Sequence, residues 1–380
     1  HALSNWSKLC DRQADALLLL ARAANEAGTW PALEGPRDES AALQRAELVL
    51  MNEGEIVVGA ASRWLAANPG LSHHHVSDAS DVQRVARLLT GTAVGLVLSG
   101  GGARGFAHIG VVRALREAGI PIDLVGGSSI GAIMGAAVAV EWSVEQMTSA
   151  FRRTFVDSNP LGDYTLPIVS LVSGRRVSDR LHKEFGACAI EDLPLPFFCV
   201  SANLTSGRTS VHTRGTLWRW LRASVAIPGV LPPVMADGQV LVDGGTMNNL
   251  PVDVMRHLGR GAIIGVDIGS DPNFESSADA MDVPPFWKIT QWARLWRRRP
   301  TLLKILLRAG MVGSTAATSA HRSQTDLLVA PPLSGVDMLN WKSFDAAVKA
   351  GYLHAVQQLG ELTPELAARL HRGTASQISA

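Results

Sequence analysis

The sequence predicts an α/β fold with a mainly parallel central sheet in three α/β/α layers, preceded by a smaller α/β segment. Two observations predict the sheet. A strand–turn–helix pattern occurs twice in succession, first over residues 93–119 and then over 122–140. The strand at 93–99 is apolar throughout, which is typical of a strand covered on both faces. Strands joined by crossover helices are expected to lie parallel.

Length and composition set the class of protein. The 380 residues suffice for two or three packing units, and 47% of them are apolar. The net charge is +1, so the sequence does not predict a nucleic-acid partner. Cys10, Cys188 and Cys199 are few, odd in number and without CxxC spacing. We therefore expect a reducing, cytoplasmic compartment, and neither a disulfide framework nor a metal site.

No apolar run reaches the roughly 18 residues that a membrane span needs. The chain begins His1-Ala2-Leu3, without Met and without a signal-peptide pattern.

Residues 1–91 are expected to form the smaller α/β segment. Strands are predicted at 14–20 and 47–51, with helical character over 40–48. A loop is predicted at 73–77. Its three consecutive histidines would point in different directions on any regular element, so they do not predict a metal site. A helix over 81–89 is expected to start from Asp78 or Ser80 and to end near Gly91.

Residues 92–270 are expected to form the main domain. Its first helix carries Ile109, Val112 and Leu115 at helical spacing and ends at Gly119. The second strand, at 122–125, leads into a buried helix over 130–140. Further strands are predicted at 197–204, 240–242, 262–268 and 326–330. Residues 271–380 are expected to form an extension that packs on this domain.

The second turn, Gly127-Ser128-Ser129-Ile130-Gly131, fits the pattern G-x-S-x-G. In that pattern a tight strand-to-helix turn exposes the serine hydroxyl at the top of a sheet. The helix that follows places its N–H groups and the positive end of its dipole near the reacting carbonyl. An ordinary glycine-rich turn is the alternative, and this motif alone does not decide between the two.

The first turn is the glycine run Gly100-Gly101-Gly102-Ala103-Arg104-Gly105. Its N–H groups suit an oxyanion hole beside a nucleophile, and Arg104 suits either ordering of the loop or contact with a phosphate head group. The run also matches the dinucleotide fingerprint G-x-G-x-x-G. That fingerprint requires an acid at the end of the next strand, whereas Asp123 lies at its start. An oxyanion hole is therefore favoured over nucleotide binding.

The third motif is Asp243-Gly244-Gly245, after the apolar residues 240–242. An aspartate at a strand end can point its carboxylate into a cleft over the sheet. Asp-Gly is also a favoured turn pair, and alone it indicates no more than a turn.

Together the three motifs resemble the patatin-like phospholipase family. Additional segments are similar to the neuropathy-target-esterase branch of that family, in its bacterial type. These segments are 106–110, 123–127, Leu217-Trp218-Arg219, Arg222-Ala223-Ser224, 229–233 and Asn248-Asn249-Leu250-Pro251. The similarity extends from about Cys10 to about residue 360, in family order.

The resemblance implies a serine esterase that cleaves lysophospholipids or phospholipids without a cofactor. Ser129 would be the nucleophile and Asp243 its base, in a dyad without histidine. Gly100, Gly101, Gly102 and Arg104 would form the oxyanion hole. The motif glycines would be Gly105, Gly127, Gly131, Gly244 and Gly245. Longer members of the branch carry cyclic-nucleotide-binding domains upstream, and this sequence shows none. His108, His212 and His257 are the candidates for the third member of a triad, and His108 is expected to be packed instead.

Residues 284–310 combine Trp287, Trp292 and Trp296 with the run Arg297-Arg298-Arg299 and several leucines. This composition predicts peripheral contact with the inner face of a membrane. A core helix with a basic solvated face is the alternative.

Two functions of other classes remain open at this stage. One is a nucleotide-binding protein that uses the glycine run. The other is a catalytically silent membrane adaptor with the same fold. An acyltransferase would use the same residues as a hydrolase, and the lipid head group and oligomeric state are not encoded in any recognisable motif.

Overall fold

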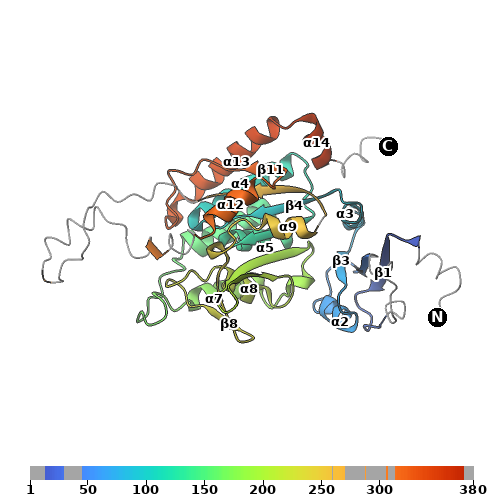
Figure 1. The fold of residues 1–380 in the computed structure, drawn as a ribbon, viewed down its shortest axis with the longest axis horizontal. Helices are drawn as coiled ribbons and strands as arrows, with labels where there is room; N and C mark the ends of the chain where they lie inside the picture. The colour runs from blue at the N-terminus through green and yellow to red at the C-terminus, as the bar shows by residue number, and fades with distance from the viewer. Residues whose placement is uncertain are drawn as a thin grey trace.

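The computed structural model describes residues 13–29, 45–258, 260–269, 287, 305–306 and 313–371. The main domain is built on a sheet of eight strands in the order β11-β10-β4-β5-β6-β9-β8, with β7 also paired to β6 (Figure 1). The strands of this sheet are β4 (Ala93–Leu98), β5 (Leu124–Ser128), β6 (Phe197–Asn203), β7 (Arg208–His212), β8 (Val234–Ala236), β9 (Gln239–Asp243), β10 (Gly261–Val266) and β11 (Leu327–Val329). The five strands from β11 to β6 are parallel to one another, and β9 is antiparallel to β6.

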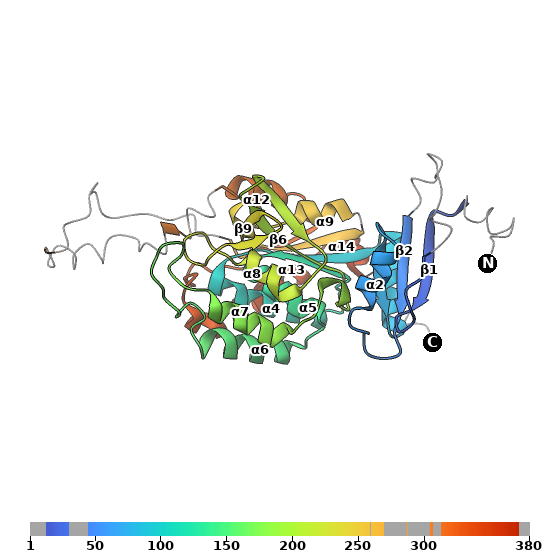
Figure 2. The same cartoon turned by 90° about the horizontal axis from the view of Figure 1, so that it is seen from below.

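Both faces of the sheet are covered, as the apolar pattern of β4 predicts. Val94, Leu96 and Leu98 belong to the core on the face of helices α4 (Ala107–Glu117) and α5 (Ile130–Ala139). Ala93 and Val97 point to the opposite face, where helix α9 (Val252–Leu258) packs. Figure 2 shows the sheet between these two layers. The α/β/α architecture is therefore confirmed.

The remaining helices of the main domain and the C-terminal part surround this core. They are α6 (Val144–Phe151), the π-helix η4 (Arg152–Val156), α7 (Arg175–Phe185), α8 (Leu217–Ser224), α12 (Thr315–Arg322), α13 (Phe344–Gly360) and α14 (Pro364–His371), with short 3-10 turns η3 (Gly102–Phe106), η5 (Ile190–Asp192), η6 (Gly244–Thr246) and η7 (Trp341–Ser343).

Helix α13 packs against α4 in close backbone contact. A Cβ atom at Gly351 would lie 2.1 Å from the carbonyl oxygen of Ala107, and one at Gly110 would lie 2.0 Å from that of Val348. The rings of Phe106 and Phe344 meet at 4.5 Å between centroids. The C-terminal residues 344–360 thus pack on the helix that follows the glycine run.

The N-terminal unit is a three-stranded parallel sheet in the order β1-β2-β3, formed by β1 (Ala16–Arg22), β2 (Arg45–Met51) and β3 (Ser72–Val76). Helices α2 (Ala60–Ala67) and α3 (Ala79–Thr90) accompany it. Asp78 caps α3 and Gly91 ends it in a left-handed conformation, as the sequence predicts.

Two predictions for this unit are wrong. Residues 45–48 form a strand instead of a helix, and the predicted loop at 73–77 is a strand over 72–76. Helix α2 is not among the predicted elements. Strand β3 forms despite its three histidines because each ring has a buried polar partner. His74 contacts the Glu47 carboxylate of β2, and the rings of His73 and His75 both contact the carbonyl oxygen of Glu191. These partners lie 27 or more positions away in the chain, and their contacts allow a polar segment to form a buried strand.

Strand β5 lies two residues further along the chain than the predicted 122–125. Asp123 is taken out of the strand by its own contacts. Its carboxylate accepts hydrogen bonds from the Arg87 guanidinium and from the N–H of Val94.

Within the described residues, no helix is both long and apolar enough to cross a bilayer. The predicted interfacial region 284–310 lies outside the described residues apart from Trp287, Ile305 and Leu306. The proposed domain limits at 91 and 270 stay predictions.

Candidate active site

Ser129 lies in the sharp turn between β5 and α5. Its φ of 54° and ψ of −127° are unusual for a residue with a side chain, and such strain is typical of a nucleophile at the end of a strand. The turn leaves no space for side chains beside it. A Cβ at Gly131 would lie 2.2 Å from the carbonyl oxygen of Leu98, and one at Gly127 would lie 2.6 Å from the backbone of Gly131. Both glycines are therefore required by close backbone approach, as G-x-S-x-G predicts.

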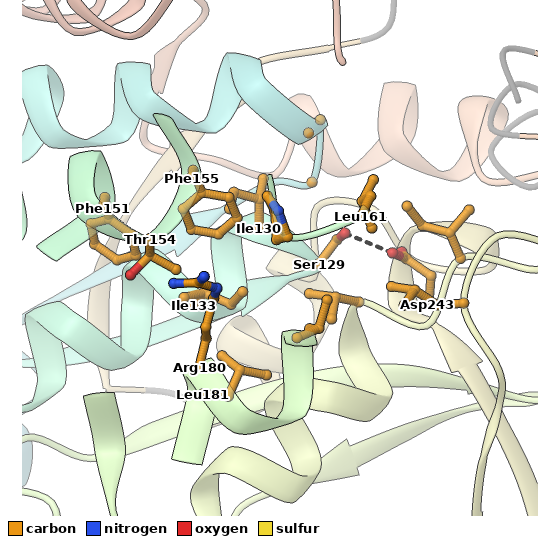
Figure 3. A pocket seen from close by; sticks show the side chains of 18 of the residues that line it. Ser129, Ile130, Ile133, Phe151, Thr154, Phe155, Leu161, Arg180, Leu181 and Asp243 are labelled. Atoms are coloured by element: carbon orange, nitrogen blue, oxygen red, sulfur yellow. Dashed lines mark hydrogen bonds between the residues drawn. The ribbon is translucent and has the colours of Figure 1, made fainter. Parts of the chain in front are cut away.

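Asp243 ends strand β9 and faces the serine. The Ser129 hydroxyl donates a hydrogen bond of 2.7 Å to Oδ2 of Asp243, and both residues are buried (Figure 3). The second carboxylate oxygen accepts a bond of 2.8 Å from the N–H of Gly245. Gly244 is needed because a Cβ there would lie 2.3 Å from the carbonyl oxygen of Val200. The turn pair Asp-Gly thus positions a carboxylate as well as reversing the chain.

Burial changes the acidity of this carboxyl. Desolvation raises the pKa of Asp243 to about 6, although the hydrogen bonds from Ser129 and Gly245 act in the opposite direction. A carboxylate with a pKa near 6 is a stronger base than an exposed aspartate and is still ionised at neutral pH. The environment therefore suits proton abstraction from Ser129.

The glycine run lies beside the serine and is clamped by Asn249. The N–H of Gly100 donates to both the carbonyl oxygen and Oδ1 of Asn249, and the Asn249 amide donates back to the carbonyl oxygen of Gly100. The N–H groups of Gly101 and Gly102 have no hydrogen bond in the part of the chain that the structure describes. These two groups are therefore free to donate hydrogen bonds to an oxyanion, whereas the N–H of Gly100 is already bound to Asn249.

The conformation of the run requires small residues. Gly102 has a φ of +58°, and a Cβ there would lie 2.3 Å from the carbonyl oxygen of Met338. At Gly105 a Cβ would lie 2.5 Å from the side chain of Ile130, the residue directly after Ser129.

Arg104 orders the loop. Its Nε donates to the carbonyl oxygen of Val336 at 2.8 Å and its Nη1 to that of Gly269 at 2.5 Å. Of the two roles that the sequence left open for Arg104, these contacts support the structural one. The guanidinium ties the glycine run to two segments that follow it in the chain.

The histidines considered for a triad lie elsewhere. His108 is buried and donates from Nε2 to the carbonyl oxygen of Ser99, and desolvation lowers its pKa to about 4. The His212 ring stacks on Trp220 and contacts the Ser201 hydroxyl. His257 is exposed on α9. No imidazole of the described residues contacts Ser129 or Asp243.

Two residues of the site had no role in the sequence analysis, although their segments carried the resemblance. Asn249 clamps the glycine run. Ser224, at the end of α8, accepts a hydrogen bond of 2.9 Å from the N–H of Ser129 and donates one of 2.7 Å to the carbonyl oxygen of Val200. Because Ser224 lies 95 positions from Ser129, no spacing in the sequence could have linked them.

A cavity opens from Ser129 and Asp243 between α5, α7 and the π-helix η4 (Figure 3). Its empty volume is about 1110 Å³, part of it open to solvent. Apolar side chains dominate its lining, among them Ile130, Ile133, Trp142, Phe151, Phe155, Leu161, Leu181, Phe185, Leu231 and Trp341. A cavity of this kind suits a long acyl chain.

The contacts of Asp123 weigh against a dinucleotide site. Asp123 lies before β5, at the opposite end of the parallel strands from the glycine run, and is bound to Arg87. The acid that would hold a ribose hydroxyl is therefore not beside the glycines.

These features agree with the comparisons with known proteins. Residues 96–256 match the family model of the patatin-like phospholipases, and the chain therefore belongs to that class of α/β proteins. Residues 1–89 match the P-loop like domain of the Neuropathy Target Esterase family, which places the chain in that branch of the class.

Curated relatives match across both regions. The chain is 33% identical over 395 residues to Neuropathy target esterase sws of Drosophila melanogaster, which covers 93% of this chain and 27% of the relative. It is 36% identical to Lysophospholipase nte1 of Aspergillus fumigatus, over 75% of this chain and 19% of the relative. An uncharacterized NTE family protein of Mycobacterium bovis is 39% identical, over 74% of this chain and 49% of the relative. The chain thus spans between a fifth and a half of the length of these curated relatives.

Proposed function

We propose that this chain is a serine esterase that hydrolyses carboxylic ester bonds of lysophospholipids or phospholipids. The observation that carries the proposal is the 2.7 Å hydrogen bond from the strained Ser129 to buried Asp243, at one end of an apolar cavity. The name Lysophospholipase nte1, carried by one relative, supports the choice of substrate.

In the proposed reaction, Asp243 accepts the proton of Ser129 as Oγ attacks the ester carbonyl. The N–H groups of Gly101 and Gly102 and the N-terminus of α5 stabilise the oxyanion. The C–O bond to the leaving alcohol breaks, the proton passes from Asp243 to that alcohol, and an acyl-serine forms. Asp243 then activates a water molecule, which releases the fatty acid and restores Ser129.

The test is hydrolysis of a short p-nitrophenyl ester and of a panel of lipid classes by wild type and by Ser129→Ala, together with labelling by a fluorophosphonate. We expect labelling and turnover in wild type and neither in Ser129→Ala. Absence of labelling in wild type would favour the silent adaptor, and a thermal shift with NAD or ATP would favour nucleotide binding. Transfer of the acyl group to an added alcohol in place of water would identify an acyltransferase.

Peripheral membrane contact is part of the proposal, with residues 284–310 as one element. Trp287, in this region, is 67% exposed. A second element is the loop at 164–169, whose side chains Tyr164, Leu166, Ile168 and Val169 are 63% or more exposed. The loop follows Pro160 and Leu161, which line the cavity, so a bilayer that receives the loop would lie beside the cavity.

Sedimentation with liposomes tests this contact. We expect Leu166→Asp with Ile168→Asp to weaken binding while hydrolysis of the short soluble ester is unchanged. Unchanged sedimentation of this double variant and of a variant with Trp287, Trp292 and Trp296 changed to Ala would remove the idea.

A further inference from the structure

One guanidinium in the cavity has no partner among the residues that the structure describes. Arg180, on helix α7, lines the cavity together with Ser129 and Asp243. Its Nε is buried and without a hydrogen-bond partner. Within the described residues, no hydrogen bond or ion pair involves its guanidinium. Buried polar groups are nearly always paired, so an unpaired one in a binding cavity calls for an explanation.

The neighbouring carboxylate does not neutralise Arg180. Glu184 lies one helical turn further along α7 and lines the same cavity. Its carboxylate accepts hydrogen bonds of 3.1 Å from Arg153 and one of 3.3 Å from the Thr154 hydroxyl. Glu184 is therefore bound by Arg153 and Thr154, and no carboxylate of the described residues forms an ion pair with Arg180.

The position of Arg180 limits what its partner can be. Figure 3 shows the guanidinium between Thr154 and Ile133, turned into the cavity that also holds Ser129. Apolar side chains surround it, and in such surroundings an ion pair is stronger than in water. An arginine presents a fork of N–H donors that matches the oxygens of a phosphate.

Building on the proposed esterase function, we propose that Arg180 binds the phosphate of the lipid substrate while Ser129 attacks its ester. The site therefore takes anionic phosphate esters of acylated glycerol in preference to neutral acylglycerols. Arg104, the arginine that the sequence offered for a phosphate, is bound to backbone carbonyls, whereas Arg180 is the one that the fold leaves available.

The test compares two substrates with the same acyl chain, lysophosphatidylcholine and monoacylglycerol, on Arg180→Met. Loss of a charged hydrogen bond predicts a fall in kcat/KM for lysophosphatidylcholine of about 10- to 100-fold. Hydrolysis of monoacylglycerol and of p-nitrophenyl butyrate should change less than about threefold. Arg180→Lys keeps the charge without the fork, and its ratio between the two lipids should fall between those of wild type and Arg180→Met.

Lys183→Met is the matched control, since it removes one positive charge from an exposed position of the same helix. It should leave the ratio unchanged. An unchanged ratio of kcat/KM between the two lipids in Arg180→Met would overturn the inference. If Arg180→Met fails to fold, as seen by its melting curve, the ratio in Arg180→Lys decides in the same way.

The carboxylate of the released fatty acid is the other anion that could meet Arg180. Inhibition of p-nitrophenyl butyrate hydrolysis by decanoate distinguishes the two. We expect similar inhibition of wild type and Arg180→Met. A loss of this inhibition together with an unchanged lipid ratio would assign Arg180 to the product and overturn the inference. Failure of the wild type to cleave any of the three esters would instead reject the esterase function itself.

Discussion

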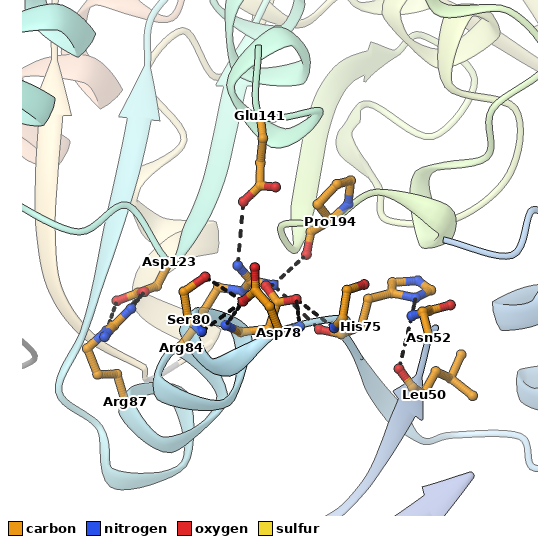
Figure 4. A network of polar contacts seen from close by, with 12 residues as sticks. Leu50, Asn52, His75, Asp78, Ser80, Arg84, Arg87, Asp123, Glu141 and Pro194 are labelled. Atoms are coloured by element: carbon orange, nitrogen blue, oxygen red, sulfur yellow. Dashed lines mark hydrogen bonds and ion pairs between the residues drawn. The ribbon is translucent and has the colours of Figure 1, made fainter. Parts of the chain in front are cut away.

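Arg84 and Arg180 are both arginines with little exposure to solvent, and they differ in the number of polar partners that bind their guanidinium groups. Arg84, on α3, has several polar partners where the N-terminal unit meets the main domain (Figure 4). It donates to Asp81 at 2.5 Å and to the carbonyl oxygens of Pro194 and His75, and it lies 3.7 Å from Glu141. Arg180 has no such partners among the described residues.

The same contrast separates the two regions as a whole. At the junction, the Glu47 carboxylate of β2 is held by His74 and by Arg260, and these contacts keep its pKa at about 2 although burial alone would raise it. In the cavity, burial instead wins and raises the pKa of Asp243 to about 6. Polar and charged partners offset the cost of burying the Glu47 carboxylate, whereas only the Ser129 hydroxyl and the N–H of Gly245 offset the burial of Asp243, which leaves Asp243 the stronger base.

The largest expected effect is on catalysis. Asp243→Asn removes the base but keeps an oxygen that can accept from Ser129, so kcat should fall by about 10³-fold or more, by analogy with other nucleophile–base pairs. The measurement is turnover of p-nitrophenyl butyrate by the purified variant. Activity within tenfold of wild type would contradict the role of Asp243.

The same variant should gain stability at high pH. The folded-state pKa of Asp243 is raised from 3.8 to about 6, so ionisation opposes folding as the pH rises through this window and the penalty is absent below pH 3.8. Two pKa units correspond to about 3 kcal/mol, and we expect a gain of that order at pH 8 that vanishes near pH 4. Urea unfolding at the two pH values measures it, and a gain independent of pH would contradict the assignment.

Arg84→Met should have the opposite effects to Asp243→Asn: it should lower stability and leave turnover nearly unchanged. Removing the centre of a buried polar network takes this partner from Oδ1 of Asp81 and from the carbonyl oxygen of Pro194, and it should cost about 3 kcal/mol of unfolding free energy. Turnover per folded molecule should change little, because no contact of Arg84 reaches the cavity. Thermal melts and active-site titration measure both quantities. A loss of turnover without a loss of stability would contradict the claim that Arg84 acts on the fold and not on the active site.

Ser224→Ala tests a positioning residue with a smaller effect. The change leaves the N–H of Ser129 without its acceptor, and kcat should fall about tenfold with KM nearly unchanged. Ser224→Thr keeps the hydroxyl and should recover part of the rate. A rise in KM alone, or no recovery in Ser224→Thr, would show that Ser224 acts through packing.

The smallest effect is expected on the surface. Arg113 and Glu117 form an exposed pair at 2.7 Å on α4, and Arg113→Gln should leave the midpoint of urea unfolding nearly unchanged, because exposed ion pairs contribute little to stability. Urea unfolding beside Arg84→Met provides the comparison. A loss of stability as large as that of Arg84→Met would mean that the burial of Arg84 and its partners does not explain the effect of Arg84→Met.

Much of this site follows from local patterns in the sequence. Gly127 is required by a contact within its own motif, because a Cβ there would lie 2.6 Å from the backbone of Gly131. The apolar run of β4 predicts a sheet covered on both faces because burial on two sides leaves no polar positions.

The rest depends on contacts between distant segments. Ser224 meets Ser129 only through the packing of α8, and the strand at 72–76 forms only because Glu47 and Glu191 meet its histidines. The sequence motifs single out Arg104 for a phosphate and give Arg180 no role, whereas in the structure Arg104 is bound to carbonyl groups and Arg180 lines the cavity. Which of them is paired is decided by carbonyl groups at Val336 and Gly269, far from both in the chain.

The central claim is that a carboxylate, without histidine, activates Ser129. The most direct test is the rate of fluorophosphonate labelling of Ser129 as a function of pH at two temperatures. The raised pKa of Asp243 predicts a rate that increases with pH through an apparent pKa of about 6, when the carboxylate becomes ionised. Because carboxyl ionisation has almost no enthalpy, this pKa should stay nearly constant with temperature. An apparent pKa that falls markedly on warming would indicate an imidazole base and contradict the dyad.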